Sequence, residues 1–151
     1  MMNRRKVIKA IATGGALIGA SVLMPRLAMA AWNQDAFGSD NQANAMKALL
    51  GAEPTASADV TLKAPSIAEN GAVVPVTVKT TAANVESISL FVEGNPTPLV
   101  AEFSVPAGTK AEVSTRIRMG KTSNITAVVK ADGQLLSASQ ETKVTIGGCG
   151  G

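Results

Sequence analysis

The chain ends in the heptapeptide TIGGCGG, which contains its single cysteine, Cys149. Two glycines precede this cysteine and two follow it: Gly147, Gly148, Gly150 and Gly151. A cysteine that packs in a core needs apolar neighbours, and glycine has no side chain to supply them. We therefore expect an exposed thiol on a thin, conformationally free arm, residues 147–151. Five residues beyond the last strand extend at most about 17 Å at ~3.4 Å each. Such an arm can enter a channel that excludes a folded domain.

The remaining composition excludes most familiar catalytic centres. The 151 residues include one cysteine and no histidine, so neither a Cys–His nor a Ser–His nucleophile pair can form. A transition-metal cluster also lacks its usual ligands. Arg116 and Arg118 alternate on an expected strand, where they either bind an anion or lie on a solvated face or at the rim of an interface. Several carboxylates are interpreted as outward-facing strand charges with no evident pairing for acid–base work: Glu86, Glu93, Glu102 and Glu112.

The first thirty residues have the features of an export signal. The segment NRRKVIK carries the pair Arg4 and Arg5, the apolar stretch Ala10–Met24 follows, and AMA predicts cleavage after Ala30. The apolar stretch is shorter than the ~20 residues of a spanning helix, although a retained N-terminal anchor is the alternative interpretation. The residues after the arginine pair resemble the twin-arginine consensus. This predicts a protein exported to the periplasm in its folded state.

The positive charge of the chain belongs to this signal. Cleavage removes five of the fourteen basic residues and none of the eleven acidic ones, which changes the formal net charge from +3 to −2. A basic groove for nucleic acid therefore has no support in the mature chain. Nucleotide chemistry is also disfavoured because no glycine-rich loop joins a strand to a helix.

A short helix is expected in residues 31–58, followed by a linker. Ser39 or Asp40 is the expected N-cap, the segment AMKALL forms the last turns, and Gly51 ends the helix. Apolar residues recur four positions apart, so this helix must pack on the domain or on a partner. The segment EPTASAD, residues 53–59, is interpreted as the linker.

Residues 59–146 have the period of two that is typical of strands. Val74, Val76 and Val78 alternate with polar residues or proline, and Asn70–Gly71 and Asp132–Gly133 are turn signals. Seven or eight short strands at intervals of about ten residues predict an all-β, immunoglobulin-like antiparallel β-sandwich of about seven strands. The last strand begins with Leu135 or Leu136 directed inward and continues through Val144 and Ile146. Outward-facing candidates for a partner surface are Val73 and Val128.

A twin-arginine signal, a short helix, an immunoglobulin-like sandwich and a terminal GGCGG together resemble the SoxY family, the thiol carriers of bacterial thiosulfate oxidation (the Sox system). The resemblance implies that Cys149 is the covalent attachment site for sulfur intermediates and that the four glycines form the arm. It also implies a carrier that is not an enzyme and holds no metal or cofactor of its own. The implied partners are a SoxZ-like β-sandwich subunit in a heterodimer, the haem enzyme SoxAX, the dimanganese hydrolase SoxB and the sulfur dehydrogenase SoxCD.

Two other functions are consistent with parts of the sequence. An exported immunoglobulin-like interaction module could use Cys149 for an intermolecular disulfide, and it would then form a stable mixed disulfide on a non-reducing gel. An enzyme or redox sensor is disfavoured by the missing histidine and the missing second cysteine.

Overall fold

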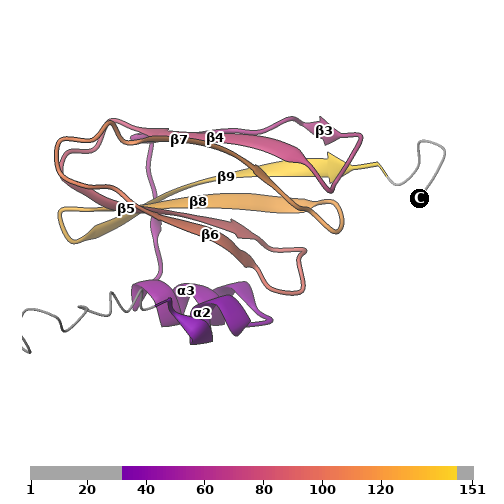
Figure 1. Ribbon diagram of the computed structural model, residues 1–151, viewed down its shortest axis with the longest axis horizontal. Coiled ribbons are helices and arrows are strands. Elements are labelled where there is room, and N and C mark those ends of the chain that lie inside the picture. Colours follow the sequence, from indigo (N-terminus) through magenta and orange to yellow (C-terminus); the bar gives the residue numbers. More distant parts are fainter. Residues whose placement is uncertain (1–31, 146–151) are drawn as a thin grey trace, which may run out of the picture. The chain divides into compact units, whose positions relative to one another are not determined.

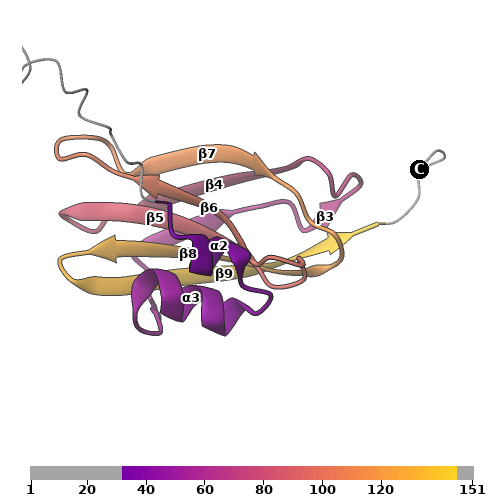
Figure 2. The same ribbon diagram turned by 60° about the horizontal axis from the view of Figure 1, so that its bottom comes forward.

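Two β-sheets packed face to face form the body of the described chain (Figures 1 and 2). The computed structural model describes residues 32–145. The larger sheet has the strand order β1–β9–β8–β5–β6, with β3 also paired to β9, and the smaller sheet has the order β2–β4–β7. The strands are β1 (Thr55–Ala56), β2 (Val60–Lys63), β3 (Ile67–Ala68), β4 (Val74–Thr80), β5 (Val85–Val92), β6 (Leu99–Ser104), β7 (Glu112–Ile117), β8 (Ser123–Ala131) and β9 (Gln134–Val144).

The all-β sandwich expected from the sequence is confirmed, with two strands more than the seven expected. Both additional strands, β1 and β3, have two residues and pair in parallel with β9, whereas the other pairs are antiparallel. β1 lies inside residues 53–59, so the expectation of a plain linker was wrong there. A strand of two residues is too short to show a period of two in the sequence. It forms because the backbone of β9 is available for pairing, which the local sequence does not reveal.

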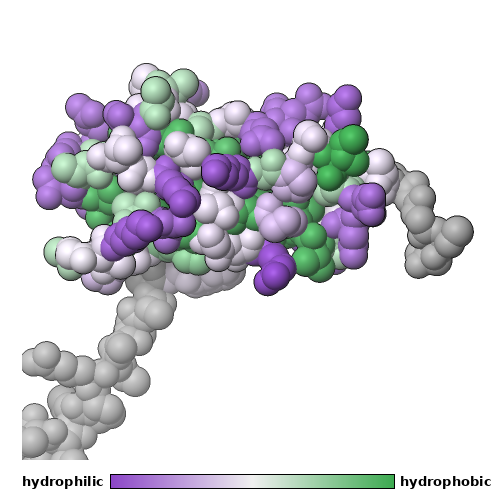
Figure 3. Space-filling view, turned by 90° about the horizontal axis from the view of Figure 1, so that it is seen from above, coloured by the Kyte–Doolittle hydropathy of each residue, from purple (hydrophilic) through white to green (hydrophobic). Residues whose placement is uncertain are grey.

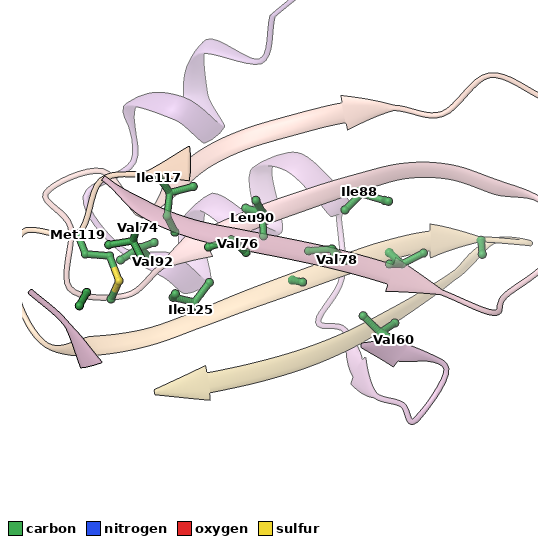
Figure 4. Packing of buried hydrophobic residues seen from close by; sticks show 14 residues of the cluster. Val60, Val74, Val76, Val78, Ile88, Leu90, Val92, Ile117, Met119 and Ile125 are labelled. Carbon is green, nitrogen blue, oxygen red and sulfur yellow. The ribbon is translucent and has the colours of Figure 1, made fainter. Parts of the chain in front are cut away.

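The main core lies between the two sheets and is built from the alternating residues. Val74, Val76 and Val78 of β4 point towards Ile88 and Leu90 of β5 (Figure 4). All five of these side chains are buried, as the period of two predicts. On β9, Leu136 packs against this core and Leu135 faces the other way, which settles the choice left open by the sequence.

Two helices cover the outer face of the larger sheet: α2 (Gln34–Gly38) and α3 (Gln42–Leu50) (Figure 1). Ala45 and Met46 of α3 pack there against Phe91, Leu99 and Val128. Val128 does point out of the sandwich, but it is only 1% exposed because the chain's own helices cover it. The prediction that Val128 belongs to a partner surface was therefore wrong.

The ends of α3 have local causes. Asn41, rather than Ser39 or Asp40, is the N-cap, and its side chain accepts hydrogen bonds from the backbone N–H groups of Ala43 and Asn44. Ser39 instead lies between the helices, where its hydroxyl donates to the carbonyl of Asp35 at 2.7 Å. Gly51 ends α3 with φ of 76°, the left-handed conformation that glycine adopts without strain.

The predicted Asp132–Gly133 turn joins β8 to β9. Both residues have positive φ, 49° and 71°, as a two-residue hairpin turn of this hand requires. β9 thus runs antiparallel to β8 over its whole paired length and reaches the opposite end of the sandwich at Val144. Among residues 32–145, no helix has the length and apolar character needed to cross a membrane.

Candidate functional site

The end of β9 is fastened from both sides. On one side the backbone N–H of Lys143 donates to the carbonyl of Ser66 at 2.9 Å, and that of Thr145 donates to Ala68 at 3.1 Å. On the other side the N–H of Val144 donates to the hydroxyl of Thr122 at 2.9 Å. The last described residues are therefore held in place by β3 and by the loop before β8. This strand end is the point from which residues 146–151 continue.

Gly71 packs at the same place with no room for a side chain. A Cβ on Gly71 would run into the carbonyl oxygen of Met119 and would lie 2.9 Å from Cγ1 of Val144. The carbonyl of Gly71 also accepts a hydrogen bond of 2.7 Å from the N–H of Met119. The sequence indicates only a turn at Asn70–Gly71, because the contact of Gly71 with Val144 depends on the tertiary fold.

The residues predicted to carry the chemistry lie outside the described range. This applies to Cys149 and to its neighbours Gly147, Gly148, Gly150 and Gly151, as it does to Arg4, Arg5 and the cleavage site after Ala30. Ile146 also lies outside it, and β9 ends at Val144. The described part of the candidate site is thus the strand end from which residues 146–151 continue, and the surface around it.

Comparison with known proteins identifies the family. The family model described as "SoxY: Sulfur oxidation protein SoxY" matches residues 46–149, so the match includes Cys149. The chain belongs to the SoxY family. The solved structure of the sulfur carrier protein SoxY from Chlorobium limicola f thiosulfatophilum is 48% identical, with a TM-score of 0.62 over 69% of this chain and 96% of that chain.

Similarity to the superoxide reductase structures is restricted to the fold. A superoxide reductase (neelaredoxin) from Ignicoccus hospitalis is 19% identical, with a TM-score of 0.51 over 57% of this chain and 80% of that chain. At this identity the likeness shows a common sandwich and carries no function. A search of the curated proteins finds no match.

Two exposed apolar residues, Ile67 and Val73, lie beside the end of β9 in this SoxY-family chain and form what we call the apolar rim. These residues are 57% and 50% exposed. Figure 3 shows hydrophobic residues gathered on this face at the end where β3 lies. Ile67 pairs with Lys143 in the β3–β9 ladder, and the N–H of Val73 donates to the carbonyl of Asn70 in the loop that holds Gly71. The rim is therefore fixed to the same backbone that fixes the end of β9. The sequence indicated Val73 as outward-facing and did not indicate Ile67.

The carboxylates of the described residues are surface charges, as the alternation predicted. Glu86 pairs with Lys130 at 2.9 Å, and Glu112 contacts Nζ of Lys79 at 2.9 Å and of Lys110 at 2.6 Å. Hydrogen bonds from Lys110, then from Lys79, lower the pKa of Glu112 to about 2, and the same contact raises the pKa of Lys110. Within residues 32–145, no three histidine, cysteine, aspartate or glutamate side chains gather as a metal site would need.

Arg116 and Arg118 differ from these paired charges. Both are exposed, and neither has an ion pair or hydrogen bond from its side chain among the described residues. Arg116 faces outward opposite Pro75 of β4, while Ile117 between the two arginines points into the core. Both arginines line a cleft between the edges of β6 and β7.

Proposed function

We propose that this protein is a covalent carrier of sulfur intermediates in thiosulfate oxidation, with Cys149 as the attachment site. The observation that carries the proposal is the SoxY-family match, which extends through the only cysteine of the chain. The related structure from Chlorobium is that of a sulfur carrier protein, and nearly all of that chain is covered. The protein itself lowers no barrier in this scheme, so it needs no base and no metal of its own.

The chemistry proceeds on the thiol while partner enzymes act on it. The Cys149 thiolate forms a bond to the sulfane sulfur of thiosulfate, and two electrons pass to a haem enzyme of the SoxAX type. This gives a cysteine S-thiosulfonate. A SoxB-type dimanganese hydrolase then adds water across the bond between sulfane sulfur and sulfonate, which releases sulfate and two protons and leaves a persulfide on Cys149. A SoxCD-type dehydrogenase oxidises that persulfide further.

A carrier of this kind needs reach at the thiol and a fixed attachment point. The hydrogen bonds at Lys143, Val144 and Thr145 supply the fixed point. Beyond Thr145, the four residues to Cys149 span at most about 14 Å at ~3.4 Å each. The apolar rim, Ile67 and Val73, lies at the base of this arm, where it would meet the entrance of an enzyme channel. Two exposed side chains suit the weak, exchangeable docking that successive enzymes require.

The proposed setting is the periplasm, reached in the folded state through the twin-arginine route. Arg4 and Arg5 would direct export, and cleavage after Ala30 would release the mature chain. A SoxZ-like β-sandwich subunit is the proposed heterodimer partner. Because Val128 is covered by α2 and α3, that subunit must bind elsewhere than over this residue.

The test is the intact mass of the mature protein after incubation with thiosulfate and the haem enzyme of the pathway. We expect a single thiosulfate adduct on Cys149, and no adduct in Cys149→Ser, which should fold and pair with its partner as the natural protein does. A protein that stays unmodified, that is modified elsewhere, or that is recovered only as a stable mixed disulfide would overturn the carrier function.

A matched control tests whether loading needs only a thiol or also needs the arm that carries it. In the double variant Cys149→Ser/Thr145→Cys, the thiol moves to an exposed position at the fixed end of β9. It should still react with a small thiol reagent, but the enzyme should no longer load it with thiosulfate. Loading at the rate of the natural protein would show that the arm is unnecessary.

A further inference from the structure

An open cleft of about 620 Å³ lies between β6 and β7. These strands are the last in their sheets, so the cleft is at an edge where the two sheets are not joined by strand pairing. Its lining includes Arg116 and Arg118, with Thr97 and Thr115 beside them and no carboxylate. Uncompensated positive charge in a recess with hydroxyl groups is suited to an anion.

The spacing of the two arginines allows them to bind a single small anion. Arg116 and Arg118 are two residues apart on an extended chain, which separates their Cα atoms by about 6.5–7 Å on one face. Guanidinium groups are planar forks of N–H donors that match the oxygens of sulfonate, sulfate and phosphate. Neither has a carboxylate partner among the described residues, so no ion pair must break before an anion binds.

The backbone of the cleft is fixed by Asn95. Its side-chain Nδ2 donates to the carbonyl of Arg118 at 2.7 Å, and its Oδ1 accepts from the N–H of Gly120 at 2.9 Å. The same loop continues to Thr122, whose hydroxyl binds the N–H of Val144. Met119, the residue after Arg118, donates its N–H to the carbonyl of Gly71, which packs against Val144. The cleft therefore lies close to the end of β9.

We propose that Arg116 and Arg118 form a binding site for a sulfur oxyanion, the SO₃ end of a thiosulfonate or of thiosulfate itself. For one source of this ligand, the thiosulfonate on Cys149, the inference rests on the proposed function, because the proposed arm starts at the end of β9, close to the cleft. Binding there would hold a loaded arm between its visits to enzymes. A persulfide has no sulfonate oxygens, so hydrolysis to the persulfide would release the arm from the arginines.

The experiment uses the mature chain labelled with ¹⁵N and needs no Sox enzyme. Tetrathionate loads the thiol directly, because the Cys149 thiolate displaces thiosulfate and keeps a thiosulfonate. Methyl methanethiosulfonate gives an uncharged methyl disulfide as the comparison. We expect amide shifts across residues 115–120 with the thiosulfonate and none with the methyl disulfide. A parallel titration of Cys149→Ser with sodium thiosulfate tests the free anion, with sodium chloride as the ionic-strength control.

The two parts of the experiment distinguish the sources of the ligand. Shifts only in the loaded protein assign the site to the arm, and shifts in the Cys149→Ser titration assign it to the free anion as well. In either case the double variant Arg116→Gln/Arg118→Gln should abolish the shifts or weaken binding at least about tenfold. The control Lys63→Gln removes an exposed positive charge from β2, which lies at the edge of the smaller sheet opposite β7. It should change neither the amide shifts nor the affinity for the anion.

The proposal is overturned if residues 115–120 do not shift in either part. It is also overturned if the double arginine variant retains the shifts or if Lys63→Gln loses them equally, since binding would then reflect net charge alone. Enzymatic loading of Cys149 is measured separately, so either the anion site or the carrier function can fail without the other.

Discussion

Replacing Gly71 by alanine should destabilise the protein by about 2 kcal/mol. The new methyl group meets the backbone of Met119 on one side and lies 2.9 Å from the side chain of Val144 on the other, so the loop must move. Overpacking of this kind costs about 1–3 kcal/mol, and movement weakens the hydrogen bond from Met119 to Gly71, which contributes about 1 kcal/mol. The lower entropy of the unfolded chain offsets about 0.4–1 kcal/mol.

Urea denaturation measures this cost, and other glycines supply the controls. With a slope of about 1–3 kcal/mol per molar urea, a loss of 2 kcal/mol lowers the midpoint by about 1 M. Gly38→Ala, at a helical position with nothing within 4 Å, should leave the midpoint unchanged or raise it. Gly120→Ala meets only Oδ1 of Asn95, at 3.7 Å, and should cost less than Gly71→Ala. A Gly71→Ala midpoint equal to that of the natural protein would refute the packing described at the end of β9.

Three further substitutions test other parts of the structure by urea denaturation. Phe91→Ala empties a fully buried position beneath α2 and α3 and should cost about 3–5 kcal/mol, with faster amide exchange in α3; unchanged exchange would contradict the docking of the helices. Asn41→Ala removes the N-cap of α3 and should cost about 0.5–2 kcal/mol, so a loss below that range would show that the cap is idle. Glu112→Gln should lower the midpoint at pH 7, because a native pKa of about 2 makes the carboxylate stabilising above its unfolded pKa near 4.5. That contribution is lost as the pH falls towards 2, so a difference that persists at pH 2 would contradict the ion-pair explanation.

The sequence predicted the inward-facing residues of the strands, but not the burial of the outer face of the larger sheet. Val74, Val76 and Val78 alternate with exposed residues, so the period of two is visible. In β5 the five consecutive residues from Ile88 to Val92 are all buried, because helices cover the second face. The sequence predicted a helix that must pack on something. It contained no signal for the outer face of the larger sheet as its place, and Val128 was assigned to a partner for that reason.

The residues of the candidate site also differ in whether their role depends on chain neighbours or on the tertiary fold. Cys149 stays a prediction, and it rests on neighbours in the chain alone, the four glycines around it. The role of Gly71 could not be predicted, because it depends on Met119 and Val144, which lie far away in the sequence. Arg116 and Arg118 were placed on one face by their spacing, but the cleft they line also needs the edge of β6, which only the fold brings near.

A fixed attachment point matters to a carrier because a longer arm reaches further but lowers the local concentration of its thiol at a partner enzyme. For a chain of n residues, the concentration of its tip near a target falls roughly as the −3/2 power of n. If the end of β9 frayed by four residues, the proposed arm of four residues would double in length and the thiol would be diluted about threefold at every enzyme. The hydrogen bonds that the backbone of Lys143, Val144 and Thr145 donates to Ser66, Thr122 and Ala68 oppose that fraying on both sides of the strand. The contacts around Val144 therefore support the chemistry proposed for Cys149, because they keep the proposed arm short and the local concentration of its thiol high.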